Sequence, residues 1–328
     1  VLLDVATRDP QTGAVASDLW VSQREGDAWS SPVPLGGGVN TGGYEVFPFL
    51  SPDGKQLYFV RDFAAFYTVP LASALASAPP TASVSPVVRY VANAGVLIEV
   101  DGRRFLIDAV FRDGIAPYAT SAADDRARLE GAQPPYADVD AVLVTHWHED
   151  HFDAAAVAAH LAHNPRAVLI SSAEVVERVR AQSPEPGSAR LQAFVPAPGG
   201  VATARVGNVP VRLVRARHNP TRRLPEQHVA YLIGERHPVL HVGDADPKAD
   251  NFAALPALPR VAVAVLPFWY LSDPASRAMV TDVIHPQRIV AVHVPPHDAA
   301  DVQRSLRATG ADVTVARHPG SSVIPPAR

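Results

Sequence analysis

Two patterns of hydrophobic and polar positions divide the chain near residue 80. Residues 1–71 contain short alternating runs rich in glycine and aromatic residues, as in the segment DLWVSQREGDAWSSPVPL. Such runs, separated by turn residues such as Pro52-Asp53-Gly54, predict short antiparallel strands. Residues 72–86 are small, polar and proline-bearing, which is typical of a linker. The pattern therefore predicts an all-β segment over 1–71, a linker over 72–86 and a further domain over 87–328.

From Val87 onward, β-rich runs alternate with helical ones. Residues 87–111 predict a strand, a turn, a second strand, the Asp101-Gly102 hairpin turn and a third strand that ends at Asp108. Helical periodicity follows in FDAAAVAAHLAHNP and SAEVVERVRAQS. Further strands are predicted for AVLVTH, AVLISS, VRLVRARH, HVAYLIGE, HPVLHVGDAD, VAVAVLPF and IVAVHV. This alternation indicates an α/β domain in which helices cover mixed sheets.

The composition is that of a folded protein with a large core. Of 328 residues, 47% are hydrophobic and 19% are charged, which is ordinary for a globular chain. The net charge of -4 disfavours a nucleic-acid binder with a broad basic face. No apolar run approaches the roughly 20 residues that span a bilayer, so stable membrane insertion is not expected. A small-molecule partner is favoured, and oligomerisation is left open.

The sequence contains no cysteine. Disulfides, thiolate nucleophiles and cysteine metal ligands are therefore excluded. The chain begins at Val1 rather than Met, so we expect a processed or trimmed product. Together these features slightly favour a periplasmic or secreted protein over a cytoplasmic one.

The densest group of candidate ligands is THWHEDH, residues 145–151, directly after the predicted strand AVLV. His146 and His148 are two residues apart, so in extended backbone their side chains lie on the same side. Asp150 and His151 are adjacent and must point differently. This spacing suits two neighbouring metal ions, one bound by each pair. Imidazole with carboxylate suits zinc, and also iron or manganese, so two divalent ions are expected, with zinc favoured.

Three more candidate ligands follow predicted strands: His218, Asp244 and His293. Strand ends are where layered α/β proteins place their sites. We therefore expect these side chains to converge with the first cluster at one edge of the sheets.

The ordered series Asp108, His146-x-His148-x-Asp150-His151, His218, Asp244 and His293 resembles the five motifs of the metallo-β-lactamase superfamily. The resemblance covers Val87 to the C-terminus. The segment NAGVLIEVDGRRFLID also resembles the branch that contains ascorbate-6-phosphate lactonase and N-acylphosphatidylethanolamine phospholipase D. An αββα sandwich is implied, with the metals at one edge between the sheets.

The resemblance also implies a role for each of these residues. The first metal would be bound by His146, His148 and His218. The second would be bound by Asp150, His151 and His293. Asp244 would bridge the two ions, and Asp108 would support the loop without binding a metal.

The implied activity is hydrolysis of an ester, lactone or phosphodiester bond by a metal-bound hydroxide. Asp150 and His293 are the expected catalytic residues, with Asp150 orienting the hydroxide. One alternative is β-lactam hydrolysis, which Asp244 disfavours because true zinc β-lactamases usually have cysteine or serine there. The other alternative is a non-catalytic, metal-containing binding protein.

The segment FLSPDGKQLYFV resembles a repeat of bacterial β-propellers with an S-P-D-G turn. A propeller needs several blades to close, and residues 1–71 have room for one or two. A propeller remnant or truncated propeller is therefore expected there, without chemistry of its own.

Several further residues have open or minor roles. His297 is a weak ligand candidate, whereas His241 is expected in the core or beside the site. A packing or surface role is expected for His160 and His163, and the roles of His228 and His285 stay open. Phe268, Trp269 and Tyr270 fit a substrate wall as well as a core. Arg222 and Arg223 fit a solvated loop slightly better than an anion site.

Overall fold

The computed structural model describes residues 1–8, 15–22, 24–25, 28–29, 32–36, 38–40, 44–76, 86–182, 187–220, 227–307 and 313–324. The chain divides into two compact units, Val1–Ser83 and Val84–Arg328. Within the described residues, no helix is both long and apolar enough to cross a membrane.

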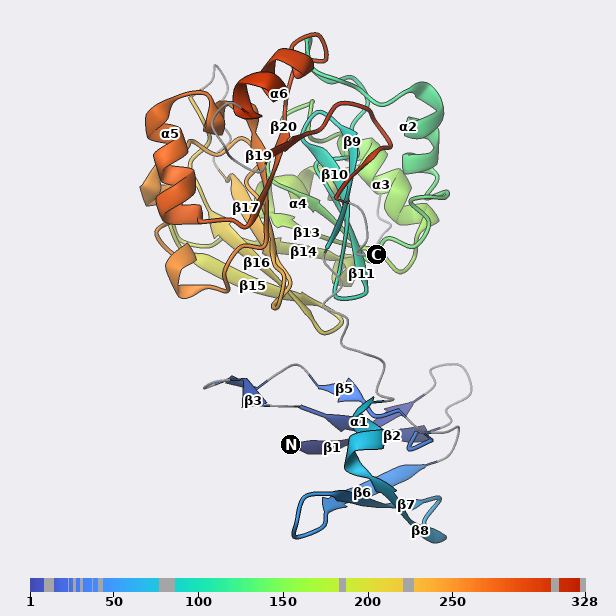
Figure 1. The fold of residues 1–328 in the computed structure, drawn as a ribbon. Helices are drawn as coiled ribbons and strands as arrows, with labels where there is room; N and C mark the ends of the chain where they lie inside the picture. The colour runs from blue at the N-terminus through green and yellow to red at the C-terminus, as the bar shows by residue number, and fades with distance from the viewer. Residues whose placement is uncertain are drawn as a thin grey trace. The chain divides into compact units, whose positions relative to one another are not determined.

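The first unit is built from small antiparallel sheets (Figure 1). They surround an apolar cluster that includes Leu19, Leu57 and Phe59. Two sheets have three strands, in the orders β1-β2-β5 and β6-β7-β8, and β3 pairs with β4. The predicted turn Pro52-Asp53-Gly54 joins β6 to β7. The elements are β1 Leu2–Arg8, β2 Val15–Val21, β3 Arg24–Glu25, β4 Ala28–Trp29, β5 Val33–Pro34, β6 Glu45–Leu50, β7 Gln56–Arg61, β8 Ala65–Pro70 and α1 Leu71–Ala76.

Small all-β sheets thus occupy the segment for which they were predicted. The propeller origin of this segment stays a prediction. Helix α1 includes the first five residues of the predicted linker over 72–86, and residues 77–85 of that linker lie outside the described residues.

The second unit contains two seven-stranded sheets. The first has the order β14-β13-β12-β11-β10-β9-β22, and the second has the order β15-β16-β17-β18-β19-β20-β21. Strands β11 to β14 are parallel to one another, and so are β18 to β21. The strands are β9 Val87–Ala92, β10 Gly95–Val100, β11 Arg103–Ile107, β12 Ala141–Val144, β13 Val168–Ser172, β14 Leu191–Phe194, β15 Val201–Val206, β16 Val209–Arg215, β17 Val229–Ile233, β18 Val239–His241, β19 Val263–Pro267, β20 Arg288–Val292, β21 Val313–Val315 and β22 Ser322–Ile324.

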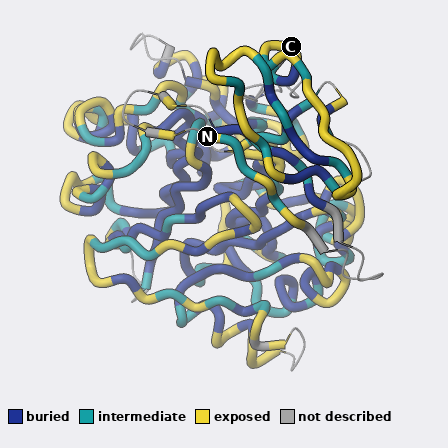
Figure 2. The backbone as a smooth tube through the Cα atoms, turned by 90° about the horizontal axis from the view of Figure 1, so that it is seen from below, coloured by how far each residue is buried: buried dark blue, intermediate teal, exposed yellow. Residues whose placement is uncertain are grey.

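The two sheets face each other across one apolar core, and alternate residues of each strand enter it. On β10, Val96 and Ile98 belong to the shared core, whereas Leu97 points to the opposite face. The pleat of a strand produces this alternation, because successive side chains leave on opposite sides. Figure 2 shows the buried residues running through the interior of the fold and the exposed ones at its periphery.

Helices cover the outer face of each sheet, which confirms the predicted αββα arrangement (Figure 1). Leu129, Val157 and Val175 place α2, α3 and α4 on the first sheet. Met279 and Leu306 place α5 and α6 on the second. The helical elements are α2 Ala123–Glu130, α3 Ala154–His163, α4 Ala173–Arg180, η1 Ser188–Arg190, η2 Ala249–Phe252, η3 Leu255–Ala257, η4 Phe268–Leu271, α5 Pro274–Met279, η5 Val280–Ile284 and α6 Ala299–Arg307.

Tyr231 is a polar link between the two sheets. Its side chain projects from β17 of the second sheet, and its hydroxyl donates to the carbonyls of Val144 (2.8 Å) and Ile170 (2.9 Å) in the first. The residue is fully buried, so water cannot replace these bonds.

We expect Tyr231→Phe to lower the free energy of unfolding by about 1–2 kcal/mol, because the buried hydrogen bonds of the hydroxyl are lost while the ring still fills its space. Urea unfolding of the two proteins measures the difference. An unchanged free energy of unfolding would show that the hydroxyl contributes no net stability.

Candidate metal centre

The predicted ligands gather where the strands of both sheets end. Asp108 directly follows β11 and His293 directly follows β20, while His146 comes two residues after β12. Because parallel strands run the same way, their carboxyl ends meet at one edge of a sheet. His218 and Asp244 lie on loops after β16 and β18, and a bridge between His218 and Ala245 holds these loops together.

The structure therefore brings all eight predicted site residues together. Ligand atoms within 4.8 Å of one another form three groups: His146, His148, His218 and Asp244; Asp150, His151 and His293; and Asp108, His146 and His151. The first two groups match the two predicted metal sites. The ligand roles of these residues stay predictions.

In the first group, imidazole lone pairs face one another. His146 Nε2 lies 3.0 Å from His148 Nδ1 and 3.3 Å from His218 Nε2. His146 Nδ1 is 2.9 Å from Thr145 Oγ1, which itself donates to Asp108, so Nδ1 has the proton and Nε2 has the lone pair. His218 Nδ1 likewise donates to the Asn219 carbonyl. A cation between these nitrogens would relieve the repulsion of the facing lone pairs.

The second group is arranged in the same way. His151 Nδ1 lies 2.9 Å from Asp108 Oδ2, which fixes the ring and turns Nε2 toward the centre. That Nε2 is 3.3 Å from His293 Nε2, and His293 Nε2 is 3.3 Å from Asp150 Oδ2. A carboxylate that orients a metal-binding histidine through its other nitrogen is a recurrent device in metal sites.

Asp244 lies between the two groups. Its Oδ1 is 3.3 Å from His151 Nε2, and its Oδ2 is 3.4 Å from His293 Nε2 and 3.8 Å from His218 Nε2. Oδ1 is buried and has no hydrogen-bond partner among the described residues. A buried carboxylate oxygen is costly unless it is paired, so this carboxylate, with histidines of both groups beside it, would be able to bind a cation of either group.

Asp108 uses both of its carboxylate oxygens in hydrogen bonds within the protein. Its two oxygens accept from the Thr145 amide (2.8 Å), the Thr145 hydroxyl (2.7 Å) and His151. It is completely buried. The residue thus holds the loop after β12 and the His151 ring, and its supporting role at a metal centre stays a prediction.

Asn93 is a positioning residue that the sequence interpretation missed. Its Nδ2 donates to the carbonyl (3.1 Å) and to Oδ2 (2.9 Å) of Asp150, and its own carbonyl accepts from the His293 amide (3.1 Å). One buried residue therefore contacts two residues of the second group, Asp150 through its side chain and His293 through its backbone carbonyl, and these two come from different sheets. The available signal was the Asn-Ala-Gly turn between two predicted strands.

Three residues of the centre have left-handed backbone: Asn93 (φ 49°), Asp108 (φ 49°) and His293 (φ 58°). For residues other than glycine this conformation costs about 1 kcal/mol each and persists only where surrounding contacts impose it. Such strain is typical of functional sites. Here it turns the chain sharply at the strand ends, where the ligands must face inward.

Gly243 lets the backbone pass close to the first group. It has a φ of +55°, and a Cβ there would lie 2.4 Å from Thr145 Oγ1 and 2.9 Å from His228 Nε2. His228, whose role was open, is buried behind the ligands, its ring centre 5.1 Å from that of His146. Its Nε2 accepts from the Asp244 amide, so it supports the loop that presents Asp244.

The electrostatics of the centre favour a cation. Burial, helped by the nearby His151, holds the pKa of His146 well below its usual value, so the ring stays neutral, as a metal ligand must be. Burial opposes charge on His151 too, but Asp244 and Asp150 raise the pKa of His151 well above its usual value. The carboxylates therefore stabilise positive charge in this position, which a divalent cation would also supply.

The remaining candidates lie in several environments. His241 is buried and bonds to the Ala94 carbonyl, and His160 is buried and bonds to the Leu129 carbonyl. The side chain of His297 is 68% exposed and pairs with Asp298 instead of joining the centre. His163 and His285 are exposed. Arg222 and Arg223 lie outside the described residues.

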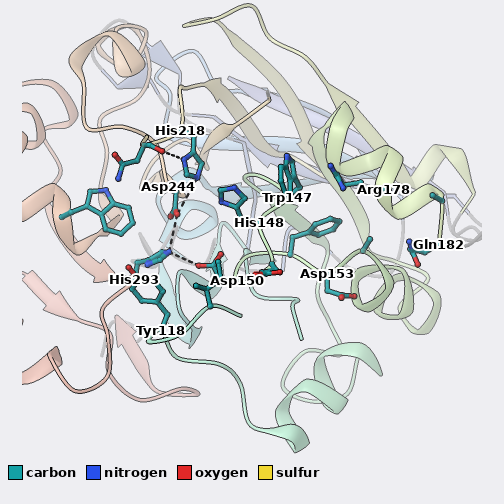
Figure 3. A pocket seen from close by; sticks show the side chains of 17 residues that line it. Tyr118, Trp147, His148, Asp150, Asp153, Arg178, Gln182, His218, Asp244 and His293 are labelled. Carbon is teal, nitrogen blue, oxygen red and sulfur yellow. Dashed lines mark hydrogen bonds and ion pairs between the residues drawn. The ribbon is translucent and has the colours of Figure 1, made fainter. Parts of the chain in front are cut away.

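The metal-ligand groups open into a cavity of about 880 Å³ (Figure 3). Of the three predicted aromatic wall residues, Trp269 lines this cavity, whereas Tyr270 is buried in the core and Phe268 lies elsewhere. Tyr118 also lines the cavity, with its ring centre 4.0 Å from that of His293. No periodicity or motif had marked Tyr118, because it lies in an irregular segment before α2.

A model of the β-lactamase superfamily domain matches residues 103–318. Since this match covers more than half of the chain, the chain belongs to the β-lactamase superfamily. Its fold and its converging histidine and aspartate side chains are those of a metallo-hydrolase of that superfamily.

Solved structures with the same fold are similar to the chain at low identity. The metallo hydrolase Igni18 from Ignicoccus hospitalis is 21% identical, over 73% of this chain and 97% of that one, with a TM-score of 0.53. Isothiocyanate hydrolase from Delia radicum gut bacteria is 17% identical, over 74% of this chain and 100% of that one, with a TM-score of 0.52. YhfI of Bacillus subtilis, a metallo-beta-lactamase fold protein, is 15% identical, over 73% of this chain and 98% of that one, with a TM-score of 0.50. No curated protein matches the chain.

We expect Asp244→Ala to weaken metal binding more than about 100-fold, because both cations would lose a shared ligand, while the fold survives. Metal-to-protein ratios after dialysis, with circular dichroism as the check on folding, measure this. Asp250→Ala, which removes an exposed carboxylate six residues away, is the matched control. Normal metal content in Asp244→Ala would contradict the two-metal assignment.

We expect Asn93→Gly to weaken binding of one of the two metals about 10- to 100-fold, because Asp150 loses the side-chain amide that holds its carboxylate and its carbonyl. Glycine removes the side chain without adding strain at positive φ. Asp101→Gly, at another left-handed position (φ 51°) in an exposed hairpin, is the matched control. Competition titration with a chromogenic chelator gives both affinities. Equal affinities in Asn93→Gly and the parent protein would show that Asn93 has no positioning role.

Proposed function

We propose that this protein is a metal-dependent hydrolase of a small molecule, acting on an ester, lactone or phosphodiester bond. The observation that supports it most is the buried Asp244 carboxylate, which lies 3.3–3.8 Å from imidazole nitrogens of both predicted metal-ligand groups, beside a large cavity. Two divalent ions, with zinc favoured, would activate a water molecule near neutral pH and polarise the bond that is cut.

The chain's own residues would orient the reactants. In this proposal Asp150, fixed by Asn93, accepts a hydrogen bond from the attacking water. His293 faces Asp150, with its Nε2 3.3 Å from Asp150 Oδ2. Burial, together with Asp244 and Asp150, raises the pKa of Tyr118. The Tyr118 hydroxyl therefore keeps its proton at neutral pH and can donate to an oxygen of the substrate.

The cavity favours a substrate with a substantial apolar part. Aromatic rings from Tyr118, Trp147, Phe152 and Trp269 line it, and such walls bind carbon-rich groups while a few polar atoms fix their orientation. The sequence likeness to the branch with ascorbate-6-phosphate lactonase and the phospholipase D supports the same range of bonds. A β-lactam ring is a weaker candidate, given Asp244 in the bridging position.

The test is a panel of four chromogenic substrates: an aryl ester, a lactone, an aryl phosphodiester and a cephalosporin. We expect turnover of at least one of the first three, loss of that turnover with a chelator, and its recovery when zinc is added back. Asp250→Ala is the control for unspecific effects of substitution. Full metal loading without turnover of any substrate would favour the non-catalytic binding protein instead.

A further inference from the structure

We propose that Arg178 and Gln182, at the end of the cavity far from the metal centre, form a subsite for a carboxylate group of the substrate. This inference rests on the proposed function, since it names the class of molecule that the same site would accept. The substrate would have a hydrolysable bond at one end, an apolar middle and a carboxylate at the other end.

Arg178 contacts the loop that presents the first metal-ligand group. Its guanidinium lies over the Trp147 ring, 4.7 Å from the ring centre. Trp147 in turn lies in sequence between His146 and His148, so the loop that presents these histidines also places the indole. In Figure 3, Trp147 lies between the histidines and Arg178, and Gln182, two residues after the end of α4, lies beyond. Stacking on an aromatic face holds a guanidinium in place while its N–H groups stay available in plane.

Arg178 is the source of positive charge in this part of the cavity. Among the described residues that line the cavity, it is the only arginine or lysine. Its acidic neighbour Glu174 is 3.9 Å away, which is an ion pair without a hydrogen bond of normal length. Glu174 also accepts a hydrogen bond from the Gln227 amide (3.3 Å), which holds its carboxylate in place beside Arg178. At 3.9 Å this carboxylate does not occupy the N–H donors of the guanidinium.

The acidic residues of the cavity do not cancel this charge. Asp150 and Asp244 belong to the metal-ligand groups, where cations would neutralise them. Asp153 accepts from the Ala156 amide at the start of α3 and lies 3.8 Å from Arg112. Glu149 is exposed, and repulsion from it would direct an anion toward Arg178.

Apolar side chains make up part of the surface between the two ends, beside Asp153 and Glu149. Phe152, Ala154 and Ala181 line the cavity together with the Trp147 ring. A chain or ring of several carbons would remove these side chains from water, whereas a polar linker would lose hydrogen bonds there. Arginine binds a carboxylate with two parallel hydrogen bonds, which gives both direction and selectivity.

The experiment uses the metal-loaded protein and two matched pairs of probes. The first pair is the 4-nitrophenyl monoester of hexanedioic acid and the corresponding ester with a terminal primary amide. The second pair, which cannot be hydrolysed, is 6-oxo-6-phenylhexanoate and its primary amide. Initial rates give kcat/KM for the esters, and calorimetry gives Kd for the ketones.

We expect the parent protein to prefer the carboxylate over the amide about 10-fold in both pairs, because a charge-assisted hydrogen bond replaces a neutral one. Arg178→Gln should remove this preference. Arg180→Gln, which removes an exposed arginine from the same helix outside the cavity, should keep it. Potassium chloride at high concentration should reduce the preference in the parent protein.

The outcomes separate this inference from the proposed function. A carboxylate preference in binding that depends on Arg178, without hydrolysis of any ester, would uphold the subsite and contradict ester hydrolysis. Equal treatment of carboxylate and amide by the parent protein would overturn the subsite. A preference that survives in Arg178→Gln would also overturn the subsite, because the carboxylate would then be bound by the metals. The same holds for a preference that Arg180→Gln removes as completely as Arg178→Gln does.

Discussion

The shared apolar core between the two seven-stranded sheets is the constraint on which the metal centre depends. Four of the predicted ligands follow β12 of the first sheet, and three lie on loops of the second. Neither sheet alone supplies a complete set for either cation. The ligand atoms reach within 4.8 Å of one another only because the alternating side chains of β10, β17 and their neighbours hold the sheets face to face.

Buried residues behind the predicted ligands restrict the orientation of the ligand side chains. Asp108, Thr145 and Asn93 use their hydrogen bonds to fix the rings and carboxylates of the centre. The left-handed backbone at Asn93, Asp108 and His293 adds strain that these contacts sustain. The centre is thus prepared in advance, so that little reorganisation is needed when cations and substrate bind.

Much of this architecture could be predicted from the sequence. Strand periodicity gave the order of elements in the second unit, and the histidine cluster after AVLV gave the position of the centre, because both signals are local. The supporting residues were harder to predict. Asn93 precedes Asp150 by 57 positions, and its role depends on a contact that the tertiary fold creates. The split of Phe268, Trp269 and Tyr270 between two environments was equally invisible, since a short 3-10 helix directs consecutive side chains in different directions.

Tyr118 and Arg178 show the same limit from another side. Neither residue belongs to a motif, and the proposed role of each depends on the other residues that line the cavity. A lone tyrosine in an irregular segment or an arginine on an amphipathic helix is usually unremarkable in a sequence. Their significance depends on the path of the cavity, which the loops after several strands define together.

The division of ligands between two sheets has a thermodynamic consequence. Each cation would act as a clamp across the sandwich, so part of its binding free energy would be spent on holding the halves together. By linkage, a change that populates a state with separated sheets lowers the apparent cation affinity in proportion to the fraction of molecules that leave the closed state. Substitutions deep in the shared core, far from any ligand, could therefore adjust how readily the centre exchanges its ions with the surroundings, without altering a single coordinating atom.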